Sequence, residues 1–306
     1  MQPVENATGA EDPLVGERLG SYAVESLIGR GAFASVYRAR QLSLGRSVAL
    51  KVLDPVVARE PLLARRFSDE ARRAGELDHP CIVPVYDAGE DAGRSFLAMR
   101  LVEGWTLTDE LGKGPLSPSR LLEITACLCA ALDHAHSRGV VHRDVKPDNV
   151  LLEPGRVWLA DFGIAATTMT AGLYTAGPIG TGQYMAPEQA QPGPIDGRAD
   201  LYALGCVIYR CLTGVPPFPG TDLATLLVAH ASEPVPGTGA IALDTFMIRA
   251  MAKDPAQRFA SGAEMLGSLQ EALEGRRVAA PPAVSAPQQV PNRPPPPRPR
   301  RRWWRR

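Results

Sequence analysis

The stretch His142-Arg143-Asp144-Val145-Lys146-Pro147-Asp148-Asn149 decides how the rest of the chain is interpreted. It is polar and leads directly into the apolar run Val150–Leu152. A second apolar run, Val157–Ala160, ends at Asp161-Phe162-Gly163. Runs of this length predict short buried strands. Loops at the ends of such strands can converge on one point, so we expect the loop 142–149 and the loop that starts at Asp161 to lie close together.

The polar side chains of these loops suit phosphate chemistry. Asp144, Asn149 and Asp161 carry oxygen ligands of the kind that Mg²⁺ prefers. An aspartate can also accept the proton of a hydroxyl group. Lys146, two residues after Asp144, can neutralise phosphate charge. An ordinary polar loop would have to match all of these positions by coincidence.

A glycine-rich stretch precedes this region, Ile28-Gly29-Arg30-Gly31-Ala32-Phe33-Ala34-Ser35-Val36, between two predicted strands. Glycines let a hairpin lie close over phosphates and offer backbone N–H groups. A strand follows the glycines, which argues against a Rossmann phosphate loop, where a helix is required. Alone, the stretch is equally compatible with a simple turn.

A lysine ends the apolar strand Val48-Ala49-Leu50-Lys51, 15 residues after Val36. A buried ammonium group needs a partner, because burial without one is costly. Phosphate oxygens would be one partner, and Glu70 on a predicted helix would be another. A solvated lysine is the usual alternative, but its position after a glycine loop argues for the buried role.

Hydrophobic periodicity divides the chain into a β-rich part and a helical part, an α+β arrangement. We expect strands at Tyr22–Ile28, Ala34–Arg40, Val48–Val52, Val83–Ala88 and Ser95–Leu101. We expect helices at Pro61–Leu77, Leu116–His136, Ala199–Leu212, Thr221–Ala231, Ala240–Ala252 and Ala263–Leu273. Residues 1–17 are polar and aperiodic, so we expect a flexible N-terminus before one folded unit at 18–275.

Composition sets bounds on the class of protein. The chain has 306 residues, of which 45% are hydrophobic and 22% charged, as in globular proteins. No run approaches the roughly 18 apolar residues of a membrane span. The N-terminus has no basic and apolar segments of a secretory signal. An integral membrane protein and an obviously exported one are therefore not expected.

The zero net charge hides an asymmetry. Residues 1–275 hold 24 basic and 33 acidic side chains, whereas residues 276–306 hold nine arginines and no acid. The tail also has nine prolines, which disfavour helices and sheet ladders. We therefore expect residues 276–306 to be a disordered basic tail.

The five cysteines include no Cys-x-x-Cys pair, which argues against zinc and dithiol sites. Cys127 and Cys129 lie in one apolar helical pattern, and Cys206 and Cys211 lie in another. We expect buried, reduced thiols, as is usual in a cytosolic protein.

Taken together, these motifs resemble those of the Hanks-type (eukaryotic-like) Ser/Thr protein kinases of bacteria, from about Leu19 to Leu273. The matching features are the glycine loop, Val-Ala-Leu-Lys, His-Arg-Asp with its asparagine, Asp-Phe-Gly and Ala186-Pro187-Glu188. The resemblance implies a two-lobed protein-kinase fold. Its β-rich N-lobe, about 18–101, would hold one key helix, and a helical C-lobe would follow at about 102–275.

The resemblance also implies roles for single residues. Asp144 and Lys146 would be catalytic, and Asn149 and Asp161 would hold Mg²⁺ or Mn²⁺. Lys51 would contact the ATP phosphates and pair with Glu70, which fits the family's register better than Asp69 or Glu76. Glu188 and Arg258 would form a buried ion pair. ATP would lie among Ile28, Gly29, Arg30, Gly31, Ala32, Phe33, Ala34, Ser35, Val36, Ala49, Lys51, Glu70, Met99, Val102 and Leu151.

Two positions depart from the family pattern. Ala34 replaces the third loop glycine, which predicts a stiffer hairpin and modest nucleotide affinity or turnover. Arg100 stands where a glutamate is common. Hinge contacts to adenine, from residues 100–102, are mainly through the backbone, so we still expect adenine to be recognised.

The segment before Ala186 predicts the substrate class. Gly180-Thr181-Gly182 resembles the peptide platform of protein kinases, with Thr181 as a Ser/Thr-specific feature. Small-molecule phosphotransferases lack this platform and are disfavoured. Arg143 would receive a phosphorylated activation loop, with Thr175 and then Thr170 as the expected sites. The activity implied is transfer of the ATP γ-phosphoryl group to protein Ser/Thr hydroxyls in bacterial signalling, with autophosphorylation.

The tail leaves several interpretations open. It would be a solvated linker, a membrane-surface contact through Trp303, Trp304 and the arginines, or a ligand for a polyproline-binding module. Charge alone permits nucleic-acid binding, but we expect no nucleic-acid partner. We expect a cytoplasmic protein, membrane-peripheral if the tail contacts lipid, or the cytoplasmic part of a truncated membrane kinase.

Partners and an alternative function follow from the same features. Kinases of this kind often pair through the N-lobe, so a homodimer for trans-autophosphorylation is one expectation. The alternative function is a nucleotide-binding scaffold with weak activity that acts through its basic, Pro-rich tail. Lys51, Asp144, Asn149 and Asp161 favour the enzyme, whereas Ala34 and the tail favour the scaffold.

Overall fold

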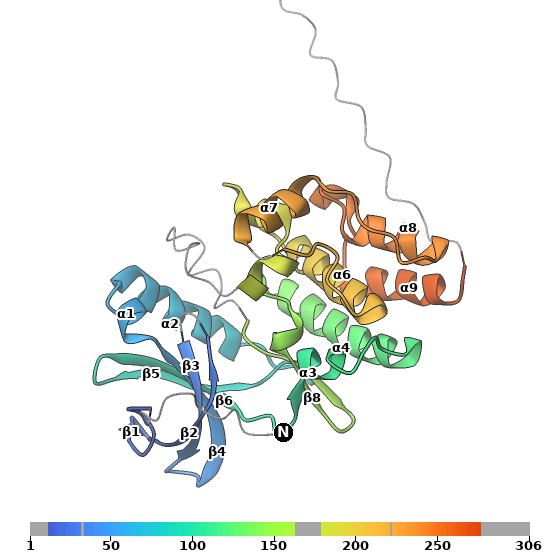
Figure 1. The fold of residues 1–306 in the computed structure, drawn as a ribbon. Helices are drawn as coiled ribbons and strands as arrows, with labels where there is room; N and C mark the ends of the chain where they lie inside the picture. The colour runs from blue at the N-terminus through green and yellow to red at the C-terminus, as the bar shows by residue number, and fades with distance from the viewer. Residues whose placement is uncertain (1–11, 32–33, 163–178, 221, 277–306) are drawn as a thin grey trace, which may run out of the picture.

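A computed structural model describes residues 12–31, 34–162, 179–220 and 222–276, without the side chains of residues 61–64, 66, 70 and 179–181. The described chain forms a β-rich N-terminal lobe and a helical C-terminal lobe (Figure 1). This two-lobed α+β architecture confirms the expected fold class.

The N-terminal lobe is an antiparallel sheet with one long helix against it. The sheet has six strands in the order β1-β2-β3-β4-β6-β5. The helix, α2, spans Pro61–Gly75 and follows a short helix, α1, at Pro55–Ala58. The strands are β1 (Arg18–Leu19), β2 (Tyr22–Arg30), β3 (Ala34–Gln41), β4 (Arg46–Leu53), β5 (Val85–Asp91) and β6 (Arg94–Arg100).

Strand β4 is buried on both faces, and its two faces have different roles. Val48, Leu50 and Val52 pack into an apolar cluster of the sheet. Because side chains alternate along a strand, Ala49 and Lys51 face the opposite way. Ala49 belongs to a different cluster, which β4 shares with the C-terminal lobe. The alternation therefore turns the lysine away from the core of the sheet.

The C-terminal lobe is built around the buried helix α4 (Pro118–His136). Helices α6, α8 and α9 surround the same core, with α7 beyond them (Figure 1). A small sheet, in the order β7-β8-β9, lies between this bundle and the N-terminal lobe. These elements are β7 (Trp105–Thr106), α3 (Leu107–Leu111), β8 (Val150–Glu153), β9 (Arg156–Leu159), α6 (Arg198–Thr213), α7 (Leu223–Ser232), α8 (Ile241–Ala250) and α9 (Gly262–Leu273).

Helices α4 and α9 approach closely at a glycine. A Cβ atom on Gly262 would lie 2.6 Å from the carbonyl oxygen of Cys129, so no larger residue fits there. Asp133 of α4 accepts hydrogen bonds from the backbone N–H groups of Gly262 and Ala263, at 2.6 and 2.9 Å. This carboxylate caps the start of α9 and fixes it against α4.

The predicted strands and helices are found, with shifted ends that have local causes. The strand expected from Val83 starts at Val85, because Pro84 has no N–H to donate. The helix expected from Thr221 starts at Leu223, where the Asp222 side chain accepts a hydrogen bond from the Thr225 N–H. Sequence patterns missed β1, α1, α3 and β7, which have five residues or fewer. In the described part of the chain, no helix has the length and apolarity that crossing a membrane requires.

The expectation that all cysteines are reduced is wrong for one pair. Cys81 and Cys127 form a disulfide, with their Cα atoms 5.7 Å apart and a sequence separation of 46 residues. The fold brings the segment after α2 against α4, a contact that local periodicity does not reveal. Cys129, Cys206 and Cys211 are free and buried as expected. Burial raises the pKa of each of these three thiols to about 12.

Glu188 and Arg258 form the expected buried ion pair. It joins the short 3₁₀ helix Pro187–Ala190 to the segment between α8 and α9. Both guanidinium Nη atoms contact the carboxylate, at 2.6 and 2.8 Å. The Arg258 side chain is fully buried, and its Nε donates to the carbonyl oxygen of Ala252. Such a fork needs arginine, because lysine cannot match its geometry.

Replacing Arg258 by Ala should therefore destabilise the protein strongly. The change leaves the Glu188 carboxylate without its partner, and removing one member of a buried pair costs about 3–5 kcal/mol. Urea unfolding would measure the loss. The matched control is Arg276→Ala, whose ion pair with Glu274 is well exposed and should change the free energy of unfolding by no more than about 0.5 kcal/mol. Equal losses for the two variants would contradict the buried-pair interpretation.

Candidate functional site

The loop 142–149 is held in place by one buried carboxylate. Asp200, in the first turn of α6, accepts hydrogen bonds from the backbone N–H groups of His142 and Arg143, at 2.8 and 2.7 Å. Its Oδ2 also lies 2.7 Å from Nε2 of His136. Arg143 has a left-handed φ of 66°, a conformation that costs energy and persists only when neighbours enforce it. The Asp200 carboxylate supplies that constraint.

The same loop gathers the three polar side chains predicted from its sequence. The Nζ of Lys146 donates to Oδ2 of Asp144 at 2.7 Å. The Nδ2 of Asn149 donates to the same oxygen at 3.0 Å and to the Asp144 carbonyl oxygen at 2.8 Å. Both contacts orient the Asp144 carboxylate. The structure therefore brings Asp144, Lys146 and Asn149 together as expected.

Lys51 and Asp161 connect the two lobes. Nζ of Lys51 lies 2.8 Å from Oδ2 of Asp161, which follows β9. Burial tends to raise the pKa of Asp161, but the charge and hydrogen bond of Lys51 and the charge of Lys146 hold it below its ordinary value. Asp161 therefore stays ionised next to the lysine. Its φ of 66° is a second strained position in the site.

The arrangement fits a divalent cation with hard oxygen ligands. Oδ1 of Asp161 is buried and has no hydrogen-bond partner among the described residues. Asn149 uses its amide nitrogen on Asp144, which leaves its carbonyl oxygen for another contact. In the described part of the chain, no group of three or more His, Cys, Asp or Glu side chains is placed to hold a metal ion. Two protein oxygens suit Mg²⁺, which usually keeps several waters and binds substrate phosphates.

An apolar cluster next to these groups joins both sheets, and it contains five of the residues predicted to surround ATP. They come from four strands and the 100–104 segment: Val36, Ala49, Met99, Val102 and Leu151. The cluster also contains Leu101 of the expected hinge, together with Val83, Trp158 and Ala160, which sequence patterns did not assign to the site. Their only signal was that they lie in or beside predicted strands.

The glycine-rich stretch forms the hairpin between β2 and β3. The N–H of Gly31 donates to the carbonyl oxygen of Ala34 at 2.8 Å and closes the turn. Ile28, Gly29 and Arg30 end β2, and Ala34, Ser35 and Val36 begin β3, whereas Ala32 and Phe33 lie outside the described residues. Ala34 is buried and does not have a positive φ, so its methyl group causes no backbone strain.

Arg100 is the unusual residue that begins the 100–104 segment, which connects the two lobes, and it has partners in the C-terminal lobe. Its guanidinium lies over the Trp158 ring, 4.7 Å from the centroid, and 3.6 Å from the Glu153 carboxylate. Glu153 also accepts hydrogen bonds from the Trp158 indole and the Glu103 N–H. Arg100 therefore stabilises the contact between β6 and β8–β9 without changing the backbone groups of the segment.

Some predicted site residues cannot be placed. Glu70 lies in α2, but its side chain is outside the described residues, so its pairing with Lys51 stays a prediction. Thr181 lies in the short 3₁₀ helix Ile179–Tyr184, also without a described side chain. Thr170 and Thr175 lie outside the described residues.

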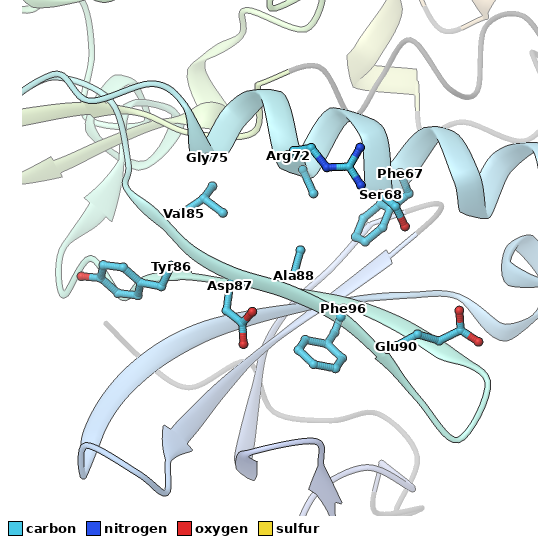
Figure 2. Close-up of a pocket in the computed structure, with 12 residues that line it drawn as sticks. Phe67, Ser68, Arg72, Gly75, Val85, Tyr86, Asp87, Ala88, Glu90 and Phe96 are labelled. Atoms are coloured by element: carbon cyan, nitrogen blue, oxygen red, sulfur yellow. The ribbon is translucent and has the colours of Figure 1, made fainter.

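A hollow of about 510 Å³ lies outside this site, between α2 and β5 (Figure 2). Phe67 and Gly75 face it from α2, and Val85 and Ala88 face it from β5. None of its lining residues belongs to the set predicted around ATP. The hollow shows that α2 is not packed tightly against β5 along its whole length.

Comparisons with known proteins agree with this geometry. The family model "Protein kinase domain" matches residues 22–267. Serine/threonine-protein kinase PknH of Mycobacterium tuberculosis H37Rv is 41% identical over 273 residues, which cover 86% of this chain and 44% of the relative. Serine/threonine-protein kinase PknB of Mycolicibacterium smegmatis is 41% identical over 275 residues, which cover 85% of this chain and 44% of that relative. The chain therefore spans under half the length of these curated relatives.

Solved structures give the same result. The crystal structure of the M. tuberculosis PknI kinase domain has a TM-score of 0.71 and 33% sequence identity. The match covers 85% of this chain and 98% of that chain. The likeness therefore extends over both lobes and the site between them.

Replacing Lys51 by Met should destabilise the protein in a pH-dependent way. The pKa of Asp161 is lowered in the folded state, so its stabilising pair is present above the ordinary Asp pKa of about 4 and is lost as the pH falls. Asp161 is a quarter exposed, so we expect a loss of about 1–3 kcal/mol at pH 7, below the value for fully buried pairs.

The measurement is urea unfolding of both proteins between pH 7 and about pH 2. The difference in unfolding free energy should shrink as the pH falls below about 4 and through the lowered pKa of Asp161, because protonated Asp161 no longer gains from Lys51. Lys113→Met, at an exposed lysine, is the matched control and should show no such trend. A difference that stays constant across this range would contradict the role of the pair.

Proposed function

The chain belongs to the protein kinase family, and we propose on that basis that it transfers the γ-phosphoryl group of ATP to Ser/Thr hydroxyls of proteins. The observation that supports this most is the convergence of five polar groups from both lobes. Lys51 contacts Asp161, while Lys146 and Asn149 contact Asp144. Phosphoryl transfer depends mainly on positioning and charge neutralisation, which such a set can supply.

Asp144 is the group we propose to act on the acceptor hydroxyl. Its carboxylate is oriented by Lys146 and Asn149 and is only partly buried, so it can be reached by a substrate. It would accept the hydroxyl proton as the oxygen attacks. Lys146, which lies beside Asp144, would neutralise charge that develops on the transferred phosphoryl group.

ATP and a divalent cation complete the proposal. Mg²⁺, or Mn²⁺ in its place, would be held by the free oxygens of Asp161 and Asn149 and would neutralise phosphate charge. Lys51 would bind the α- and β-phosphates, and the hairpin at Gly29 and Gly31 would cover them. The apolar cluster that contains Ala49 and Met99 would receive the adenine ring.

Regulation and partners extend the proposal. Nε of Arg143 is buried without a hydrogen-bond partner among the described residues, which suits it to a phosphate group. A phosphorylated Thr175 or Thr170 would supply that phosphate, and Thr181 would help to recognise Ser/Thr acceptors. Homodimers, membrane contact through the basic tail and a cytoplasmic location remain predictions of the sequence.

The alternative of a weakly active scaffold is not favoured. It rested on Ala34, which adopts ordinary strand geometry, and on the tail, which lies outside the described residues after Arg276. The named relatives are serine/threonine-protein kinases, and the function proposed here is the same.

Replacing Asp144 by Asn should abolish phosphoryl transfer while leaving the fold and ATP binding intact. Removal of a general base costs typically 10²–10⁴-fold in rate, and Asn keeps the shape of the side chain. Intact mass, measured before and after ATP with Mg²⁺, should show added phosphates in the wild type only. Asp254→Asn, at an exposed helix cap that Asn also suits, is the matched control and should behave like the wild type.

The outcome also tests the proposed regulation. Added phosphates should map to Thr175 or Thr170. An absence of added mass in the wild type, with a generic protein substrate also left unmodified, would contradict the proposed function.

A further inference from the structure

The disulfide between Cys81 and Cys127 joins the two lobes next to the candidate site. Cys81 lies six residues after the end of α2, on the N-terminal side of the connection between the lobes. Cys127 lies in the middle of α4, at the centre of the C-terminal lobe. The loop that the bond closes contains β5, β6 and the whole 100–104 segment. The bond is therefore a covalent tether across the connection between lobes.

The tethered segment also contacts the strand that carries Asp161. The carbonyl oxygen of Cys81 accepts a hydrogen bond from the Leu159 N–H at 2.8 Å. The Val83 N–H donates to the Leu159 carbonyl oxygen at 3.0 Å. Leu159 ends β9, two residues before Asp161. Segment 81–83 therefore lies between α4 and the strand that leads to the Lys51–Asp161 pair.

The position of α2 depends on this anchor. The hollow between α2 and β5 leaves part of the helix without close packing against the sheet (Figure 2). Gly75, at the end of α2, lies at one end of the hollow, near Val85. Phe67 and Ala71 hold the middle of α2 against Leu53 and Leu97, and Ala74 packs into the core of the C-terminal lobe. The bond through Cys81 restrains the C-terminal end.

The two sulfur atoms differ from the other thiols in ways that permit reversible chemistry. Cys81 and Cys127 are both half-buried, whereas the three free cysteines are buried. Burial raises the pKa of these three thiols to about 12, which keeps them protonated and unreactive. Sγ of Cys127 also lies 3.1 Å from the carbonyl oxygen of Val157, so a reduced thiol would find an acceptor there. Both redox states can therefore be accommodated.

We propose that Cys81 and Cys127 form a redox modification site that hydroperoxides close and dithiols reopen, and that the closed form is the more active kinase. The proposal rests on the kinase function above. A kinase uses ATP and is expected in a reducing compartment, where protein disulfides are usually transient and often redox-sensing. A permanent structural bond would be unusual there.

The chemistry balances with one peroxide per bond. One thiolate attacks a peroxide oxygen, which gives a sulfenic acid and hydroxide. The second thiol then attacks the sulfenic sulfur, forms the S–S bond and releases water. Two thiols thus lose two electrons and two protons, and hydrogen peroxide is reduced to two waters. A dithiol returns the electrons and protons through a mixed disulfide.

The closed form should be more active because the tether restricts movements of segment 81–83. That segment supports the strand before Asp161 and the end of the helix that carries Glu70. We expect reduction to lower kcat/KM at least threefold and to lower Tm by several degrees, since a bond that closes a loop of this length stabilises the folded protein.

The test uses the full chain, treated with hydrogen peroxide or with dithiothreitol. Alkylation in denaturant followed by mass spectrometry counts free thiols, and two more should be labelled after reduction. Phosphorylation rate, ATP affinity and Tm are then measured for each state. Activity should follow the fraction of closed bond across a redox titration.

Variants identify the cysteines responsible. Cys81→Ser and Cys127→Ser should each behave like the reduced wild type and lose the response to oxidant. Cys129→Ala, which removes a buried free thiol of the same helix, should keep the response. If one of the two serine variants fails to fold, the other still tests the proposal.

Each outcome separates this proposal from the kinase function. A bond that forms and raises Tm without changing activity would show a purely structural role and overturn the proposal. Failure of the two thiols to pair would also overturn it. No phosphorylation in either redox state would contradict the kinase function. In that case, equal ATP affinity in the two states would overturn the redox site as well.

Discussion

The carboxylate of Asp200 is the contact on which the candidate site depends. It is completely buried, and a buried charge must be satisfied by hydrogen bonds. Two of its donors are the N–H groups of His142 and Arg143, so the loop cannot leave without exposing an unpaired carboxylate. The backbone at Arg143 is strained, and its hydrogen bond to the Asp200 carboxylate helps to offset that strain. Asp144 follows directly and takes its position from this arrangement.

The second constraint crosses the lobes. Lys51 is placed by the alternation of β4, and Asp161 is placed by the end of β9. Their ion pair forms only if the two sheets keep their relative position, which the shared apolar cluster and the contact of Arg100 with Trp158 support. The geometry of the candidate site is therefore a property of the interface between lobes as much as of either lobe.

The sequence predicted contacts between residues that are close along the chain, and it missed contacts between residues that are far apart. Asp144, Lys146 and Asn149 lie within six residues, so local spacing sufficed to bring them together. The α+β division and most element positions followed from hydrophobic periodicity. The Cys81–Cys127 bond could not be predicted, because the contact depends on how the segment after α2 packs against α4. The partners of Arg100 were missed for the same reason, since Glu153 is close to it only in the folded chain.

The most direct test of the central claim is amide hydrogen exchange in the Asp200→Asn variant, followed residue by residue. A neutral amide can accept from fewer donors than a carboxylate, and hydrogen bonds to a charged group contribute about 1.5–3 kcal/mol. The account predicts that the N–H groups of His142 and Arg143 exchange about 10- to 100-fold faster in the variant, while the amides of the middle of α6 stay protected. Unchanged protection of both loop amides would contradict it.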